Sequence, residues 1–261
     1  MIWKFIGASS IGTSHQDIGE QCQDNCYFNS ISLTDENCIF LGLTSDGAGS
    51  SSQGAKGAEI ACGLAKDIIE KWLINSGQFK NLNKELIREW VIKIHNEISD
   101  IAYKNNSVPR EYACTLLVNF TGFDYSVSFQ IGDGAIIYRK NNILGPVFWP
   151  DNGEYSNTTY FITDDDFLDH LRINITNSPP DEIAMFSDGL QMLALVYKSY
   201  TIHEPFFDPM FSALRNTDHN DCVKLNEQLQ LFLDSPSINE RTDDDKTLIL
   251  ATRIDRLKLK E

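Results

Sequence analysis

Aspartates dominate the residues that could do chemistry in this chain, and each lies where an apolar run stops. Asp24 stands in CQDN, Asp46 in LTSDGAG and Asp188 in MFSDGL, and an acidic run at 243–245 precedes KTLILA. Each motif borders a β-like stretch, so each carboxylate is expected to project from a strand end. Carboxylates that are distant in sequence but meet at one edge of a sheet form an oxygen-only site for hard divalent cations. The pattern predicts the two-metal site of a hydrolase.

Three Asp-Gly pairs begin at Asp46, Asp133 and Asp188, and any one of them alone would be read as an ordinary turn. Their contexts favour more than a turn. Asp46 ends an apolar strand and precedes a Gly/Ser-rich loop that opens a helix, and Asp188 has the same strand-to-helix setting. A glycine after a ligand aspartate also lets its own carbonyl approach a cation, because no Cβ intervenes.

Composition limits the class of protein. The 261 residues are 42% hydrophobic, which is ample for a sizeable core, and no linker or repeat divides residues 1–261, so one domain is predicted. A net charge of −15 argues against a nucleic acid or an anionic membrane as partner. The segment MIWKFIGASSIG is no signal peptide, and no apolar run approaches the roughly 20 residues of a membrane span. We expect a soluble, cytoplasmic protein.

Six cysteines are too sparse for a disulfide scaffold, and most lie in apolar stretches where a reduced thiol packs as a small hydrophobe. Cys22 and Cys26 have a spacing that could suggest zinc. No second cysteine pair or histidine pair completes four ligands, so zinc is not expected.

Apolar periodicity predicts the elements that must position the acids. Strands are expected, with TDEN as the turn between the first two, over residues 25–33, 37–45, 112–120, 126–131, 135–139, 183–187 and 247–252. Spacings of three and four predict helices from about residue 54, over 83–105, and near 190–200, 205–214 and 221–233. The first two helices are expected to pack antiparallel across one face of a sheet.

The segment between residues 140 and 180 is less regular. Phe161 and Ile162 are expected to end a strand, and Thr163 to begin a helix with the acids 164–166 in its first turn. Residues 141–159 have a loop-like composition, which suggests a cover over the cleft that sets specificity. Strands and helices in blocks rather than strict alternation predict an α+β class with antiparallel sheets and helices outside.

The order of these motifs resembles, over nearly the whole chain, the metal-dependent protein phosphatases (PPM, the type 2C serine/threonine phosphatases). CQDN makes Asp24 similar to the first metal-ligand aspartate of that family. SDGAGS looks like its Asp-Gly motif, in which Asp46 would bridge two metals and the Gly47 carbonyl would bind one. ACTLLV resembles the family strand that carries a threonine after a small residue.

The later motifs extend the resemblance. FQIGDGAIIYR looks like the family turn that makes Asp133 a candidate for a weaker third metal, and FSDGL matches the motif with another ligand, Asp188. DDKTLIL is similar to the late Asp-Asn-x-Thr signature and aligns the final ligand with Asp244. Asp245 stands where the family often has Asn, so the choice between Asp244 and Asp245 stays open, while Asp243 reads as a solvated charge.

The resemblance implies the remaining expectations. The fold would be a four-layer αββα sandwich of two antiparallel sheets flanked by helices. Two Mn²⁺ or Mg²⁺ ions would share a water, lower its pKa and direct the resulting hydroxide at phosphorus without a phosphoenzyme. The substrates would be proteins phosphorylated on serine or threonine, and a protein kinase encoded nearby would be the partner. A short chain free of regulatory segments suggests a stand-alone enzyme of the bacterial type.

The chain also departs from the family pattern. An arginine that grips the substrate phosphate is replaced by Gly19, and a histidine after the Asp-Gly pair is replaced by Ala48. His15 is a candidate for the phosphate-gripping role, which would place it beside Asp24 and Asp46 among the catalytic residues. The alternative for His15 is a solvent-exposed loop histidine.

Other interpretations of the sequence fit less well. A non-catalytic pseudophosphatase or interaction module of the same fold gains weight from the missing arginine and histidine. A calcium-binding domain lacks the EF-hand loop and its terminal glutamate. Ser50, Ser51 and Ser52 have no adjacent histidine and no GxSxG elbow, and no GxxxxGK[ST] loop is present to bind a nucleotide.

Overall fold

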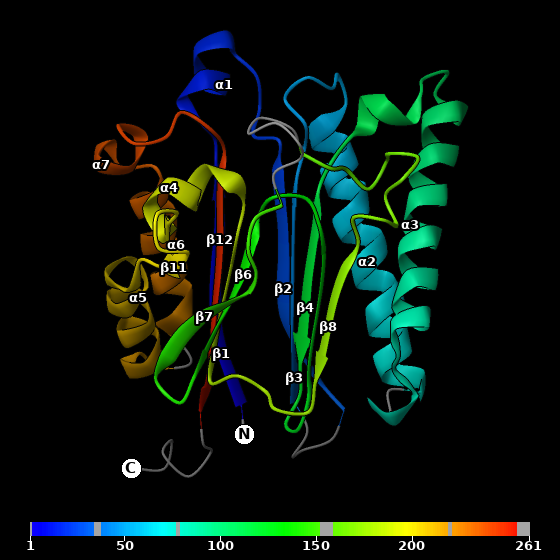
Figure 1. The fold of residues 1–261 in the computed structure, drawn as a ribbon. Coiled ribbons are helices and arrows are strands. Elements are labelled where there is room, and N and C mark those ends of the chain that lie inside the picture. Colours follow the sequence, from blue (N-terminus) through cyan, green and yellow to red (C-terminus); the bar gives the residue numbers. More distant parts are fainter. Residues whose placement is uncertain (1, 34–37, 77–78, 152–158, 219–220, 255–261) are drawn as a thin grey trace.

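A computed structural model describes residues 2–33, 38–76, 79–151, 159–218 and 221–254. Two antiparallel β-sheets lie face to face, and helices cover the outer face of each sheet (Figure 1). This arrangement confirms the predicted α+β class and the four-layer sandwich. The expected turn TDEN at 34–37 lies outside the described residues.

Each sheet has five strands, and every pairing is antiparallel. The first sheet has the order β1 (Ile2–Ser10), β12 (Lys246–Ile254), β9 (Glu182–Phe186), β6 (Ala135–Lys140) and β7 (Ile143–Phe148). The second has the order β2 (Asp24–Ser32), β3 (Cys38–Asp46), β4 (Leu116–Thr121), β5 (Ser126–Ile131) and β8 (Arg172–Thr176). A short hairpin joins β10 (Leu195–Val196) and β11 (Thr201–Ile202).

The helices divide between the two outer faces (Figure 1). Long helices α2 (Gly54–Ser76) and α3 (Lys84–Lys104) cover the second sheet, with the 3-10 turns η1 (Phe79–Asn81) and η2 (Pro109–Tyr112) beside them. The first sheet is covered by α4 (Gln191–Ala194), α5 (Glu204–Asn216) and α6 (Cys222–Leu233). Short helices α1 (Thr13–Ile18) and α7 (Pro236–Asn239) and the 3-10 turn η3 (Asp188–Leu190) complete the described elements.

Side-chain alternation along the strands builds three hydrophobic layers. In β3, Ile39 and Leu41 face α2 and α3, whereas Phe40 points into the layer between the two sheets. That inter-sheet layer also holds Met185 and Ile249 from the first sheet. Because both faces of each sheet are buried, the central strands are nearly continuous apolar runs, and the sequence signal for them is strong.

The expected long helices are confirmed. The Asn83 side chain accepts a hydrogen bond of 2.8 Å from the Leu86 amide and caps α3, which follows from its place before an apolar stripe. Trp72 of α2 and Trp90 of α3 meet edge to face with ring centroids 5.5 Å apart. None of the helices in the described part of the chain is long and apolar enough to cross a membrane.

Several expectations between residues 110 and 200 were wrong. Strand β4 begins at Leu116, because residues 109–112 form a 3-10 turn instead. The predicted helix at 190–200 stops at Ala194 and gives way to the β10–β11 hairpin. No helix begins at Thr163, where the described chain has only turns. Asp164 accepts a hydrogen bond from the Phe161 amide, a local contact that competes with helix formation.

Besides the β10–β11 hairpin, three described strands of the two large sheets were not predicted from the sequence. β1 pairs with β12 along its whole length, and β8 forms the edge of the second sheet. β7 begins inside the segment expected to be a loop, after a turn in which Asn141 and Asn142 have positive φ, as tight hairpins require. Pro146 is tolerated in β7 because this strand is an edge. Nothing in the structure tests a covering role, since 152–158 lie outside the described residues.

Two glycines of α2 give a matched test of this packing. A Cβ at Gly57 would sit 2.1 Å from the Tyr112 carbonyl oxygen, whereas one at Gly63 would meet nothing within 4 Å. We expect Gly57→Ala to lower the free energy of unfolding by about 1–3 kcal/mol through overpacking. Gly63→Ala should raise it by about 0.5–1 kcal/mol through helix propensity. Urea denaturation measures both, and equal effects at the two positions would contradict the packing of α2 on η2.

Candidate functional site

The strand pair β2–β3 places the first two candidate acids opposite each other. Asp24 begins β2, Asp46 ends β3, and the two are direct partners in the antiparallel register. Asp24 is 8% exposed, and its Oδ2 accepts a hydrogen bond of 2.7 Å from the Ser187 hydroxyl. Ser187 directly follows β9 of the other sheet, so Asp24 sits where the two sheets meet.

The backbone around Asp46 is fixed by its neighbours. Its amide donates to the Thr115 hydroxyl at 2.9 Å, and its carbonyl accepts from the Thr115 amide at 2.8 Å. The Gly47 amide donates to the Gln23 carbonyl, and a Cβ at Gly47 would lie 2.3 Å from the Gly54 carbonyl carbon. Only glycine allows α2 to begin this close to the strand end. None of the hydrogen bonds found among the described residues ends on the Gly47 carbonyl oxygen.

Asp133 lies in the turn between β5 and β6, and three polar side chains hold that turn. Gln130 donates to the Gly132 carbonyl at 3.0 Å, and Gln191 donates to the Asp133 carbonyl at 2.8 Å. The Thr159 hydroxyl donates to Asp133 Oδ2 at 2.6 Å. Gly132 has φ +109°, a conformation that other residues rarely adopt. The carboxylate of Asp133 is therefore presented on a rigid turn.

Asp188 and the acids before β12 meet through a close backbone approach. A Cβ at Gly189 would lie 2.0 Å from the Asp245 carbonyl oxygen and 3.4 Å from Asp244 Cβ. The glycine after Asp188 thus lets η3 pass directly beside the start of β12. This contact brings Asp188 next to Asp244, although the two are far apart in sequence.

Adjacent acids Asp244 and Asp245 have different surroundings. Asp245 is 2% exposed, and its two carboxylate oxygens accept hydrogen bonds from the Gly12 amide at 2.6 Å and the Gln23 amide at 2.5 Å. His15 Nδ1 lies 3.0 Å from Asp245 Oδ2. Asp244 is more exposed to solvent than Asp245, and its side chain accepts a local hydrogen bond of 2.8 Å from the Asp245 amide. Asp245 therefore ties three segments together, and Asp244 is left facing the other aspartates.

Electrostatics show how closely the five aspartates are gathered. Burial raises the pKa of Asp46 well above its usual value, and the charges of Asp188, Asp24, Asp244 and Asp133 raise it further. Burial likewise raises the pKa of Asp24 to about 7, although hydrogen bonds from the side of the opposite sheet lower it. The pKa values of Asp133, Asp188 and Asp244 are also raised, in each case first by burial. The sequence-predicted acids therefore share one site.

The donor set suits hard divalent cations. Asp24 Oδ1 is buried and accepts no hydrogen bond from the described part of the chain, which is unfavourable for a carboxylate oxygen. As the described side chains stand, no three His, Cys, Asp or Glu are close enough together to hold an ion. All candidate ligands are oxygens, the preference of Mg²⁺ and Mn²⁺. Cys22 and Cys26, the zinc alternative, are free thiols.

His15 is not a solvent-exposed loop residue, so that alternative was wrong. It lies in α1, its side chain is 12% exposed, and its Nε2 is 4.0 Å from Glu20 Oε2. Although His15 Nδ1 lies close to Asp245, the geometry of this contact is not that of a hydrogen bond. Burial lowers the pKa of His15, but Asp245, Asp244 and Glu20 together raise it above its usual value. Gly19 ends α1 with φ +72° and offers no cation.

Some positioning residues were missed by sequence reasoning. They share small or neutral polar side chains that support the acids through hydrogen bonds, and they are Gln130, Thr159, Ser187 and Gln191. Ser187 could have been suspected because it immediately precedes Asp188 in FSDGL. Gln191 carries no local signal, since its partner, the Asp133 carbonyl, is brought near only by the fold.

Known proteins resemble this chain over most of its length. The profile of a family described as Protein phosphatase 2C matches residues 11–234. Serine/threonine-protein phosphatase 3 of Escherichia coli (strain K12) is 36% identical over 251 residues, which cover 96% of this chain and 98% of that protein.

Solved structures share the fold at low sequence identity. A crystal structure of a bacterial serine phosphatase has a TM-score of 0.66 at 14% identity, over 98% of this chain and all of that one. The serine/threonine phosphatase Stp1 from Staphylococcus aureus has a TM-score of 0.64, also at 14% identity, over 98% of this chain and 96% of that one. At this identity the likeness establishes the αββα fold alone. Together with the family profile and the E. coli relative, it shows that the chain belongs to the protein phosphatase 2C family.

Proposed function

We propose that this protein is a metal-dependent phosphatase that hydrolyses phosphoserine and phosphothreonine on proteins. One observation supports the proposal above others: four aspartates surround Asp46 so closely that each raises its pKa, while a buried oxygen of Asp24 has no partner. Bound cations would offset the charge of such a cluster and stabilise it. Membership of the protein phosphatase 2C family and the E. coli relative support the choice of reaction.

The ligand set proposed for Mn²⁺ or Mg²⁺ consists of carboxylates and one carbonyl. Asp46 would serve two ions, with Asp24, Asp188 and Asp244 and the open Gly47 carbonyl completing the set, and Asp133 would serve a weaker third. Asp245 is excluded from it because two backbone amides already occupy its oxygens. When bound, such ions would make a water nucleophilic and offset charge on the phosphoryl oxygens.

Other side chains of the protein would position the acids and bind the substrate phosphate. Ser187 and Thr115 hold the Asp24 carboxylate and the Asp46 backbone, respectively, at fixed positions. His15 is the candidate for binding the substrate phosphate, because neighbouring carboxylates favour its charged form and Nε2 lies 3.9 Å from where a Gly49 Cβ would be. It would replace the arginine absent at Gly19.

The finer expectations remain predictions. They concern one catalytic domain over residues 1–261, a cytoplasmic location and a protein kinase as functional partner. The alternative of a non-catalytic module of this fold is favoured by no observation among the described residues. A net charge of −15 still argues against nucleic acid and anionic membranes as partners.

Metal dependence and residue specificity test the proposal directly. We expect the purified protein to dephosphorylate a phosphothreonine peptide with Mn²⁺ or Mg²⁺ and to favour it over the phosphotyrosine version of the same peptide. EDTA should stop turnover, and fresh Mn²⁺ should restore it. Phosphate release measures all three results. Turnover that persists in EDTA would rule out the metal-dependent reaction.

Replacing an aspartate with asparagine distinguishes a metal ligand from an acid that has only a structural role. We expect Asp46→Asn and Asp188→Asn each to lower kcat/KM by at least about a hundredfold, because outer residues of metal sites alone cost 10–100-fold. In EDTA the same variants should melt at a higher temperature than the wild type, since one repelling charge is gone. Asp166→Asn, at a carboxylate 62% exposed, is the control and should change neither quantity. Activity retained in both cluster variants would show that the ligands are wrongly chosen.

The neighbours Asp244 and Asp245 are distinguished by a paired substitution. Asp245→Asn should lower the free energy of unfolding by about 1–3 kcal/mol, because an amide nitrogen would face the Gly12 or Gln23 amide and leave a buried donor unpaired. Asp244→Asn should weaken Mn²⁺ binding with little loss of stability. Urea denaturation in EDTA and calorimetric Mn²⁺ titration measure the two effects. The opposite pattern would make Asp245 the ligand.

A further inference from the structure

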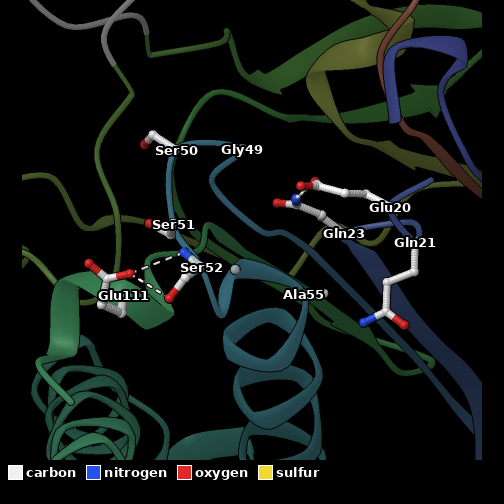
Figure 2. A pocket seen from close by; sticks show the side chains of 10 residues that line it. Glu20, Gln21, Gln23, Gly49, Ser50, Ser51, Ser52, Ala55 and Glu111 are labelled. Atoms are coloured by element: carbon white, nitrogen blue, oxygen red, sulfur yellow. Dashed lines mark hydrogen bonds between the residues drawn. The ribbon is translucent and has the colours of Figure 1, made fainter. Parts of the chain in front are cut away.

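A pocket of about 460 Å³ opens beside the aspartate cluster and is not explained by the phosphatase reaction. It lies between the segment that leads into β2, the Gly49–Ser52 loop that follows β3, and the start of α2 (Figure 2). Gln23 of its wall immediately precedes Asp24, and the Gly47 amide donates to the Gln23 carbonyl. The pocket is thus adjacent to the site where a phosphorylated residue would bind.

Two carboxylates give the pocket its charge. Glu20 stands on one side and Glu111 of η2 on the other, and no Lys, Arg or His is among the described residues that line the pocket (Figure 2). Ser52 donates to Glu111 Oε2 through its hydroxyl at 2.6 Å and its amide at 3.1 Å. These bonds hold the Glu111 carboxylate in place and lower its pKa. His15, Lys56 and Arg110, which neighbour lining residues in space or in sequence, are not themselves part of the lining.

A buried amide oxygen adds an independent observation. Gln23 is 7% exposed, and its Oε1 has no hydrogen-bond partner among the residues that the structure describes. Its Nε2 donates to Glu20 Oε2 at 3.2 Å, and its backbone amide is held by Asp245, so the side chain is fixed between the two. Oε1 lies 2.9 Å from where a Cβ of Gly54 would be, on the pocket wall. A buried acceptor without a partner is unfavourable, and an N–H donor from a ligand would satisfy it.

Acceptor oxygens and negative charge define the chemistry of the occupant. Two carboxylates and an amide oxygen require a group rich in N–H donors and positive in charge. An arginine side chain has five N–H donors in a planar fork and no acceptor, and lysine has three. An extended peptide advances about 3.3 Å per residue, so a side chain one to three residues from the phosphorylated residue would reach a pocket this near.

We propose that this pocket is a subsite for a basic side chain, arginine above all, of the phosphoprotein close to its phosphoserine or phosphothreonine. The inference rests on the proposed phosphatase function and adds a substrate class to it. The phosphate would be drawn to the cation-binding aspartates, while the arginine would be bound by Glu20, Glu111 and Gln23 Oε1. Opposite charges in substrate and site would then fix the direction of the peptide.

Kinetics on matched peptides test the subsite. Two phosphothreonine peptides are compared that differ only by Arg or Ala at the two positions on either side of the phosphothreonine. We expect the wild type to have kcat/KM about five- to tenfold higher for the arginine peptide, the size expected of two partly exposed charge-assisted contacts. The variant with both Glu20→Gln and Glu111→Gln should lose that ratio. Glu59→Gln, at an exposed carboxylate of α2 outside the pocket, should keep it.

Binding without turnover separates this inference from the phosphatase proposal. Fluorescence anisotropy with the same labelled peptides on the Asp46→Asn protein should show the same preference for arginine and its loss in the double glutamine variant. If no peptide is hydrolysed but this preference is present, the reaction is wrong and the subsite stands. Equal binding and turnover of both peptides, or a preference that survives in the double variant, would overturn the subsite.

Discussion

Like charges repel at the end of the sandwich where Asp46 faces four other aspartates, and the remaining structure must hold them there. Two carboxylates 4 Å apart repel by about 4 kcal/mol at an effective dielectric near 20. Burial raises the free-energy cost of keeping these carboxylates charged, and for this reason their pKa values lie above the usual range. The two sheets and their apolar layers supply the opposing stability, because both faces of each sheet are covered. The acids come from both sheets, so only the assembled sandwich brings them together.

Hydrogen bonds from neighbouring residues, rather than contacts among the acids, hold the acids in place against that repulsion. Thr115 fixes the strand end that carries Asp46, and Ser187 binds Asp24 across the gap between the sheets. Asp245 shows how one acid in such a region can be stabilising: two amides and a nearby imidazole surround it. Its neighbour Asp244 lacks such a set of partners and adds its charge to the cluster. Neighbours in sequence thus have opposite physical roles.

Charge is also distributed unevenly around the site. The aspartate cluster, once it holds cations, would attract the phosphate of a substrate, while the adjacent pocket with Glu20 and Glu111 stays negative. Gln23 links the two regions, since its backbone contacts Asp245 and its side chain contacts Glu20. A site with this polarity recognises a phosphate and a basic side chain at the same time. Its selectivity would come from electrostatic complementarity, which acts on encounter as well as on binding.

The sequence by itself determined the candidate acids and most of the central strands. The borders of apolar runs are local signals that identify Asp24, Asp46 and Asp188 as candidates, whereas Asp133 was identified through the resemblance of its turn to a known family. Edge strands such as β7 and β8 were missed because half-exposed strands have weaker patterns, and a proline in β7 hides one of them.

Tertiary structure alone decided how neighbouring polar residues differ in their surroundings. Asp244 and Asp245 are distinguished only by the Gly12 and Gln23 amides, and His15 becomes part of the site only because α1 packs against Asp245. These contacts join residues more than 200 positions apart. No periodicity or local spacing encodes such contacts, because they arise from how the two sheets pack.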